Sequence, residues 1–527
     1  MPAPDPREIT SYDEVPYESH PFAQTHPDRL AMVATLLGME PAPLEGCRVL
    51  ELGCASGGNL IPIAAGLPAS RCLGIELSER AVTAGKAMIA ALRLRNVELR
   101  QASILEVGAD LGLFDYIICH GVYSWVPAEV RDRILGICAQ NLAPNGVAYV
   151  SYNTYPGWHL RGTIRDMMCY HARSFTDPVQ KVRQATALVD FIAKSAPGKD
   201  TPYAKLLAEE REVLRGKPDS YLFHDHLETH NQPLYFHEFA ERAEAKKLRY
   251  LAEAQVSSMA AHTFPAEVQK TLSQLAVSRV HGEQYMDFLR NRTFRQTLLC
   301  HEDVPLKHHV VPERIMGLRV ASGARPMEAN SPLADRTTVE FAAHQLRLKT
   351  SSPLMKTALA ELARRWPQSV PFAELLEIVR GRLGVAGSAV TFERHRRDLA
   401  THLLRCYVTS PIIELHVDAP PFVLEPGKRP IASPLARWQA KSRRSVTNLR
   451  HENVQLSDAE RQTLLLLNGR RERPALFEAL LALVARGTLV ARRKGEPVSD
   501  PETQRAATAN ALETILQRLA RYALLVG

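Results

Sequence analysis

The sequence predicts a Rossmann-like α/β domain, followed by a mainly helical middle domain and a winged-helix-like α+β domain at the C-terminal end. Three observations predict the first domain. An apolar strand over 49–52 enters a glycine turn and then a helix. Apolar strands alternate with helical stretches over the next ~100 residues, and an acidic residue ends each of the first two strands. This alternation builds a parallel sheet whose ligands bind beyond the carboxyl ends of the strands.

The remaining elements of this domain follow in chain order. Helical apolar spacing predicts a helix over 78–94, in which Ser78 is a suitable N-cap residue. The expected strands are the apolar runs 49–52, 72–75, 97–101, 116–119 and 147–152. Their carboxyl ends bring the residues near 103, 120 and 153 to one crevice.

The glycine turn indicates which cofactor this crevice holds. Its glycines, Gly53, Gly57 and Gly58, do not follow the G-x-G-x-x-G spacing that receives a pyrophosphate. Glu51 instead stands where a carboxylate could meet an ammonium group, and Glu76 where it could accept two ribose hydroxyls. The pair predicts S-adenosylmethionine as cofactor. The alternative is a tight strand–helix connection with no ligand.

The expected cofactor-binding residues lie on the turn, at the strand ends and in the N-terminal segment. Ser103 stands where many methyltransferases carry an aspartate that accepts from the adenine amino group. We therefore expect backbone N–H groups of that loop to contribute to the adenine contact. The full set is Tyr17, Glu51, Gly53, Ala55, Gly57, Asn59, Glu76, Leu77, Ser103, Ile104, His120 and Gly121.

Two aromatic segments, 120–125 and 151–158, follow the fourth and fifth strands. Aromatic faces attract cations, and tyrosine or asparagine oxygens could align an amine for methyl transfer. We expect Tyr123, Tyr152 and Asn153 to orient the acceptor. For Trp125 and Trp158, packing in the core is an equal alternative.

The histidine-rich segment 223–230 places His226 and His230 four residues apart, a spacing also found in zinc sites. The alternative is a hydrogen-bonded cluster at a helix start. We favour the cluster and expect no metal, because Pro233 breaks the helix early and no cysteine completes a site.

Composition and charge restrict the partners and the compartment. Residues 1–170 carry 13 Lys/Arg and 18 Asp/Glu, whereas residues 338–527 carry 29 and 18. The basic residues lack interleaved aromatic residues, so we do not expect a nucleic-acid partner. The eight cysteines are scattered, no apolar run could span a membrane, and the N-terminal residues do not resemble a secretory signal. We expect a cytoplasmic protein.

The expected domain boundaries are 1–170 for the methyltransferase domain with an N-terminal lid segment, 171–320 for the helical domain and 338–527 for the C-terminal domain. Residues 321–333 read as a linker. Expected helices over 354–362, 372–383 and 391–406, with a strand over 412–417, fit a winged-helix module. Residues 421–450 read as irregular.

Several motifs together resemble the methyltransferases that carry a methyltransferase regulatory domain. They are the N-terminal segments 11–17 and 22–27, the turn at 51–54, the loops 120–125 and 151–158, and the segment 221–236. The best-known relatives are rickettsial-type protein-lysine methyltransferases that modify outer-membrane proteins. The resemblance implies a class I fold that binds S-adenosylmethionine, a homodimer, a helical middle domain near the cleft and a protein-lysine acceptor.

Two other functions remain open from the sequence. One is a small-molecule O- or N-methyltransferase, which a closed aromatic pocket would favour. The other is a regulatory protein that senses S-adenosylmethionine and binds nucleic acid through an exposed helix carrying Arg394, Arg396 and Arg397.

Overall fold

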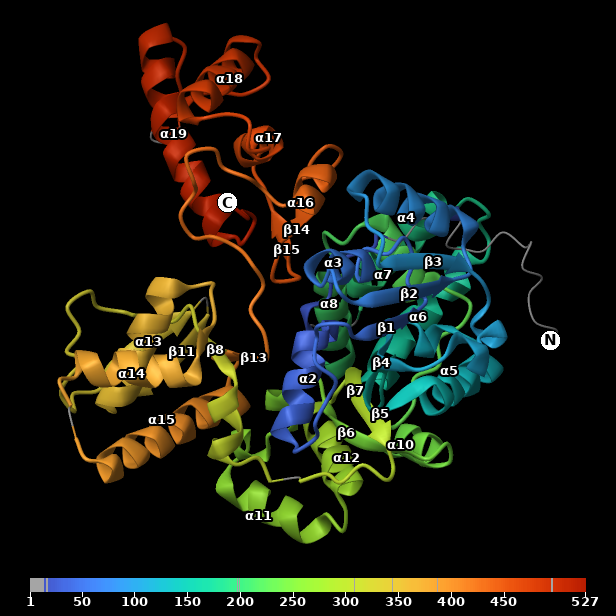
Figure 1. The fold of residues 1–527 in the computed structure, drawn as a ribbon. Coiled ribbons are helices and arrows are strands. Elements are labelled where there is room, and N and C mark those ends of the chain that lie inside the picture. Colours follow the sequence, from blue (N-terminus) through green and yellow to red (C-terminus); the bar gives the residue numbers. More distant parts are fainter. Residues whose placement is uncertain are drawn as a thin grey trace.

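A seven-stranded sheet organises the molecule (Figure 1). The computed structural model describes residues 14–15, 18–196, 198, 200–307, 309–343, 345–385, 387–493 and 496–527. The strand order is β3-β2-β1-β4-β5-β7-β6. The first five strands pair in parallel and confirm the predicted Rossmann-like core. They are β1 (Arg48–Leu52), β2 (Arg71–Glu76), β3 (Val97–Gln101), β4 (Phe114–Cys119) and β5 (Leu142–Asn153).

Two further strands come from the mainly helical middle region and join the same sheet. β6 (Leu248–Glu253) and β7 (Phe294–His301) pair antiparallel with each other, and β7 pairs antiparallel with β5. Both strands lie within the expected 171–320 domain but complete the sheet of the expected 1–170 domain. Short apolar runs of this kind cannot be told from buried helix by periodicity alone.

Helices cover both faces of the sheet. One face packs on α2 (Pro27–Leu36), α3 (Leu60–Gly66) and α4 (Glu79–Leu92). The other packs on α5 (Ala128–Asn141) and α10 (Phe236–Glu244). Ser78 caps α4 by accepting from the backbone N–H of Ala81 at 3.1 Å, as the sequence predicts.

A buried ion cluster fixes the added strands. The guanidinium of Arg295, on β7, is fully buried and donates to Glu253 on β6 and to Glu283 and Asp287 on α12 (Arg279–Arg290). Since a buried charge needs paired partners, this cluster fixes β6, β7 and α12 relative to one another.

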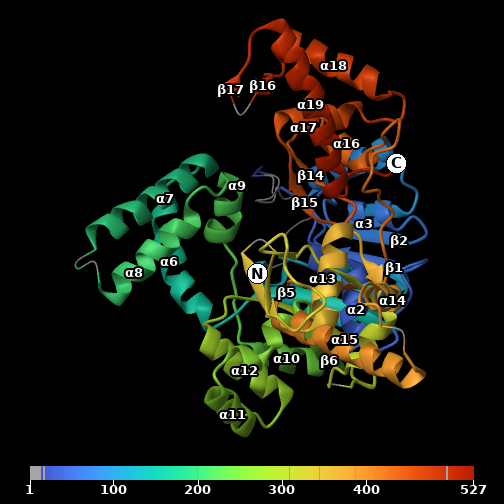
Figure 2. The same ribbon diagram turned by 90° about the vertical axis from the view of Figure 1, so that its left-hand side faces the viewer.

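The middle region also forms a helical hairpin assembly that projects from the sheet (Figure 2). It consists of α6 (Gly157–Ala172), α7 (Pro178–Ser195), α8 (Pro202–Leu214), α9 (Asp219–Leu222) and the π-helical turn Phe223–Leu227. These helices share their own apolar core. α11 (Ala266–Leu275) lies between β6 and α12 in the chain.

A third unit spans residues 319–417, and its first part corrects the expected linker at 321–333. Ala321, Ser322 and Ala324 are buried there. Its helices are α13 (Pro353–Arg365), α14 (Phe372–Arg382) and α15 (Ala389–Thr409). Its strands are β8 (Arg319–Ala321), β9 (Arg325–Pro326), β10 (Val339–Ala343), β11 (Leu346–Thr350), β12 (Val370–Pro371) and β13 (Glu414–His416).

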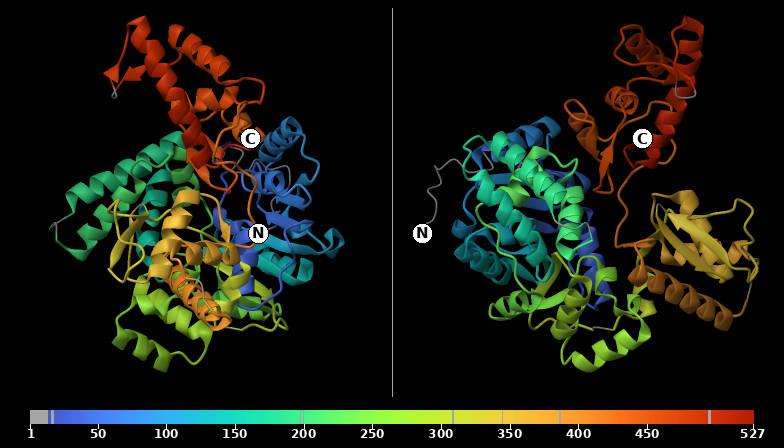
Figure 3. Two further views of the ribbon diagram at one scale, coloured as in Figure 1. Left: turned by 60° about the vertical axis from the view of Figure 1, so that its left-hand side comes forward. Right: turned by 180° about the vertical axis from the view of Figure 1, so that it is seen from behind.

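The C-terminal unit, seen from behind in Figure 3, has a separate apolar core and contacts the third unit through Arg450 and Arg521. It contains α16 (Pro434–Gln439), β14 (Ser445–Thr447), β15 (Asn453–Gln455), α17 (Asp458–Leu466), α18 (Arg473–Ala485), β16 (Arg492–Arg493), β17 (Glu496–Pro497) and α19 (Pro501–Arg521). α16 and β14 lie in the stretch that the sequence suggested was irregular. Within the described residues, no helix is long and apolar enough to cross a bilayer.

Candidate functional site

A cavity of about 770 Å³ lies at the carboxyl ends of β1, β2 and β4. This is the position that the parallel-sheet prediction requires. Ten of the twelve expected cofactor-binding residues line it, namely Glu51, Gly53, Ala55, Asn59, Glu76, Leu77, Ser103, Ile104, His120 and Gly121. The two exceptions are Gly57, which does not line the cavity, and Tyr17, which lies outside the described residues.

The glycine turn shapes one wall of the cavity. Gly53 has a φ of +70°, and a Cβ there would lie 2.5 Å from Val122. Only glycine fits this position without strain. Gly57 donates from its N–H to the carbonyl of Cys54 at 2.8 Å, so it closes the turn instead of facing the cavity.

Glu76 is held in place by the turn that follows β1. Its two carboxylate oxygens accept from the backbone N–H groups of Ala55 and Ser78, each at 2.9 Å. The carboxylate is therefore oriented before any ribose hydroxyl arrives.

Glu51 is the most informative group for the cofactor. It is 4% exposed; its Oε1 accepts from the Asn59 amide at 2.8 Å, and its Oε2 has no hydrogen-bond partner among the described residues. Burial raises the pKa of Glu51 to about 8. A buried acidic oxygen without a donor fits a ligand that brings a cation, as the ammonium end of S-adenosylmethionine would.

An N-terminal strap, residues 18–25, crosses the glycine turn and contributes to the lining of the cavity. Ser19 Oγ accepts from the backbone N–H of Gly58 at 2.8 Å, and the N–H of Phe22 donates to Asn59 Oδ1 at 2.9 Å. Glu18, Ser19, His20 and Phe22 line the cavity. Their aromatic and polar composition was the only sequence signal for this role.

At the expected adenine side of the cavity, the side chain and the backbone N–H of Ser103 are both engaged in local hydrogen bonds. Ser103 Oγ accepts from the N–H of Leu105 at 3.2 Å, while the N–H of Ser103 donates to Glu106 at 2.8 Å. Ser103 thus caps the turn after β3, and Ile104 and Leu105 provide the apolar lining there.

His120 connects the strap to the sheet. Its ring lies 3.8 Å from the ring of Phe22, and its Nδ1 is 2.8 Å from the hydroxyl of Tyr149. Burial lowers the pKa of His120 to about 4, so the imidazole is neutral at physiological pH. A neutral ring suits a wall that faces a sulfonium cation.

The expected catalytic residues divide into two groups. Asn153 lines the cavity, and its amide donates to Asn231 at 3.0 Å. Tyr123 and Tyr152 are at most 1% exposed, lie in the core beneath the sheet with Phe239, and do not line the cavity. The structure therefore does not place either tyrosine where it could contact the acceptor. Successive residues of a strand face opposite sides, so Tyr152 and Asn153 diverge.

The rest of the cavity is lined by residues that sequence reasoning mostly missed. Trp125 and Trp158 meet edge to face with centroids 6.2 Å apart. Asp225, whose pKa burial raises, faces the same space, and Phe294 on β7 is 38% exposed. Nothing in the local sequence near 294 signals a site, because β7 joins the sheet from far along the chain.

The histidine segment behaves as a hydrogen-bonded cluster. His224 Nε2 is 2.7 Å from the carbonyl of Val15, and the carbonyl of His226 accepts from the thiol of Cys169 at 3.2 Å. Burial lowers the pKa of His226 to about 4. Across the described ranges, no group of three or more His, Cys, Asp or Glu residues could hold a metal ion.

Family models match three parts of the chain. A methyltransferase domain matches residues 50–148, a predicted methyltransferase regulatory domain matches 218–301, and the C-terminal winged helix domain of PKMT matches 428–524. The last match places the winged helix in the C-terminal unit. It corrects our assignment of that fold to the three helices α13 to α15.

Relatives extend the similarity to almost the whole chain. An uncharacterized protein of Rickettsia prowazekii is 35% identical over 526 residues, which cover 98% of this chain and 93% of that protein. The structure of PKMT2 from Rickettsia typhi has a TM-score of 0.88 and 30% identity, and covers 97% of this chain and 100% of its own. The same protein in complex with AdoHcy has a TM-score of 0.88 and 31% identity.

Proposed function

This chain belongs to the PKMT family of S-adenosylmethionine-dependent methyltransferases, and we propose that its acceptor is the ε-amine of lysine side chains in a protein. One observation supports this acceptor best. The cavity that contains Glu51 and Glu76 is also lined by Trp125, Trp158 and Asp225, and by Phe294, which is 38% exposed. A lysine side chain has the apolar stem and cationic head that such a lining favours.

The cofactor side is assigned to residues already in place. Glu51 receives the ammonium end, Glu76 the ribose hydroxyls, and Ile104 and Leu105 pack on the adenine. When bound, S-adenosylmethionine supplies an electrophilic methyl group. The strap, with the ring of Phe22 against that of His120, excludes water from this side.

On the acceptor side, the chain positions the amine and promotes its neutral form. Trp125 and Trp158 together form an aromatic wall beside the lysine stem. Asp225 attracts the ammonium, and Asn153 offers an amide oxygen to orient the amine. Desolvation between aromatic walls lowers the pKa of a lysine and so favours the nucleophilic free amine. Rate acceleration then comes mainly from proximity and orientation.

We further propose a cytoplasmic, homodimeric protein. All eight cysteines are free thiols, as expected in a reducing compartment. Tyr170 on α6 and Val179 and Phe191 on α7 are each at least 60% exposed and offer an apolar surface for a second copy. Light scattering during size-exclusion chromatography tests the dimer.

The expected units 1–170, 171–320 and 338–527 remain our proposal for the domain organisation. The separate apolar core of the C-terminal unit supports a domain of its own there. The strands β6 and β7, by contrast, join the sheet of the first unit. Limited proteolysis, with the fragment ends determined by mass spectrometry, tests these boundaries.

Transfer of labelled methyl from S-adenosylmethionine tests the function. Whole-cell protein and a small-metabolite extract serve as separate acceptors, with Glu76→Ala as the control. Label in protein that is lost in the variant supports the proposal and allows the modified residue to be mapped. Label only in metabolites would instead establish a small-molecule methyltransferase.

The reading as a nucleic-acid-binding sensor has little support on α15. Arg396 pairs with Glu393 at 3.2 Å, and Arg397 with Glu313 at 3.5 Å. Absence of transfer to either acceptor, with cofactor binding retained, is the result that would favour this sensor.

A further inference from the structure

Asn59, the residue before α3, connects three distant parts of the chain behind the cofactor cavity. Its amide nitrogen donates to Glu51 at 2.8 Å. Its amide oxygen accepts from the backbone of Phe22 at 2.9 Å and lies 2.7 Å from Nε2 of His451. His451 lies 392 residues further along the chain, in the C-terminal unit.

The hydrogen-bond partners fix both the amide and the imidazole. The backbone N–H of Phe22 can only donate, so the amide oxygen of Asn59 must face it. Since that same oxygen faces His451, Nε2 must carry the imidazole proton and donate it. Burial, followed by the nearby His26, keeps the pKa of His451 well below its ordinary value, so the ring is neutral.

The turn that carries His451 is held rigidly. It joins β14 to β15, which lie beside α3 in Figures 1 and 2. Asn448 Oδ1 accepts from the N–H groups of Arg450 and Glu452, each at 2.9 Å. The guanidinium of Arg450 donates to Glu414 of the third unit at 2.8 Å.

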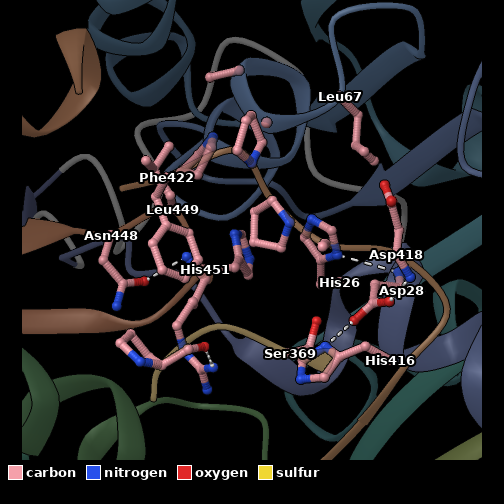
Figure 4. Close-up of a pocket in the computed structure, with 18 of the residues that line it drawn as sticks. His26, Asp28, Leu67, Ser369, His416, Asp418, Phe422, Asn448, Leu449 and His451 are labelled. Carbon is pink, nitrogen blue, oxygen red and sulfur yellow. Dashed lines mark hydrogen bonds and ion pairs between the residues drawn. The ribbon is translucent and has the colours of Figure 1, made fainter. Parts of the chain in front are cut away.

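His451 also lines a second cavity of about 540 Å³, between α2, the third unit and the C-terminal unit. Figure 4 shows His451 there with His26, Asp28 and His416. His416 Nδ1 lies 2.7 Å from Asp28, so it joins the third unit to α2 and does not contact Asn59. Asn59 lines the cofactor cavity and His451 lines the second cavity, so the contact between them lies between the two.

We propose that His451 is a positioning residue of the cofactor site: by holding the amide of Asn59, it fixes the carboxylate of Glu51 that receives the ammonium end of the cofactor. The C-terminal winged-helix unit thereby contributes directly to cofactor affinity. This inference rests on the cofactor site described above and does not depend on the identity of the acceptor.

Calorimetric titration of the full chain with AdoHcy tests the proposal. Loss of one neutral hydrogen bond predicts that His451→Ala binds AdoHcy about three- to tenfold more weakly. His451→Gln, whose amide nitrogen reaches the position of Nε2, should bind within about twofold of the wild type. His416→Asn is the matched control and should also stay within about twofold.

Three outcomes would overturn the positioning role. They are unchanged affinity in His451→Ala, an equal loss in His416→Asn, or failure of His451→Gln to restore binding. Wild-type binding is measured first, because its absence would remove the cofactor site itself and this inference with it.

A second measurement needs no variant. Coupling between two sites is reciprocal, so AdoHcy must stabilise the contact that His451 makes. Hydrogen exchange of backbone amides over 445–456 should slow when AdoHcy is added to the wild-type chain. Exchange that AdoHcy leaves unchanged in this turn would contradict the proposal.

Discussion

Replacing Glu51 by glutamine should stabilise the chain without ligand while weakening its binding of the cofactor. Burial raises the pKa of Glu51 from 4.5 to about 8. Between pH 4.5 and pH 8 the folded chain holds a proton on Glu51 that the unfolded chain has lost, so the free energy of unfolding falls as the pH rises. This loss of stability is absent below pH 4.5 and complete above pH 8.

The size of the effect follows from that interval. Each pH unit corresponds to about 1.4 kcal/mol, so the upper limit is about 5 kcal/mol above pH 8. Glutamine keeps the acceptor for Asn59 but never ionises. A change of about 1 kcal/mol in the free energy of unfolding shifts the melting temperature by about 2–4 °C. Because relaxation of the cavity reduces the effect, the melting temperature of Glu51→Gln should lie on the order of 10 °C above that of the wild type at pH 8.5. At pH 5 the two melting temperatures should be nearly equal.

Thermal unfolding of both chains between pH 5 and pH 8.5 measures this gap, with the exposed Glu209→Gln as the control. A gap that does not change with pH, or a variant that melts lower at pH 8.5, would refute the reasoning. Saturating AdoHcy should narrow or reverse the gap, because Glu51→Gln loses a charged hydrogen bond and binds about 10- to 100-fold more weakly.

Three other predictions address the strap, the acceptor side and the added strands. A Cβ at Gly58 would lie 2.3 Å from the carbonyl of Ser19, so Gly58→Ala should weaken AdoHcy binding at least tenfold by calorimetry. Gly66→Ala is the control and should not weaken binding, because nothing lies within 4 Å of a Cβ there. Tyr152→Phe should keep methyl-transfer activity within about threefold of the wild type, because Tyr152 lies in the core. Asn153→Ala should lose activity, because Asn153 lines the cavity. The reverse ranking of the two variants would show that the tyrosine contacts the acceptor. Arg295→Met removes the cation that Glu253, Glu283 and Asp287 share, and Arg292 remains only beside Glu253 and Asp287. The variant should lower the free energy of unfolding by about 3–5 kcal/mol in urea, and a loss below about 1 kcal/mol would show that the cluster is not needed.

The sequence was informative where local signals and long-range structure coincide. The strand that ends in Glu51, the glycine turn and Glu76 lie within one short stretch, so their roles and the first five strands follow from spacing. Tyr152 could have been excluded, because a strand that turns Asn153 to the cavity turns its neighbour to the core. By contrast, β7 and His451 reach the site through tertiary contacts alone.

The antiparallel pairing of β5 with β7 has a consequence for how the protein can be divided. The family model for the catalytic domain ends at residue 148, yet β5 continues to Asn153 and pairs with β7 from Ala148 onward. A fragment cut after residue 170 would expose an unpaired strand edge, the usual template for aggregation. The segment that matches the regulatory-domain model therefore supplies two strands of the sheet that holds the cavity, and it cannot be removed without exposing the edge of β5.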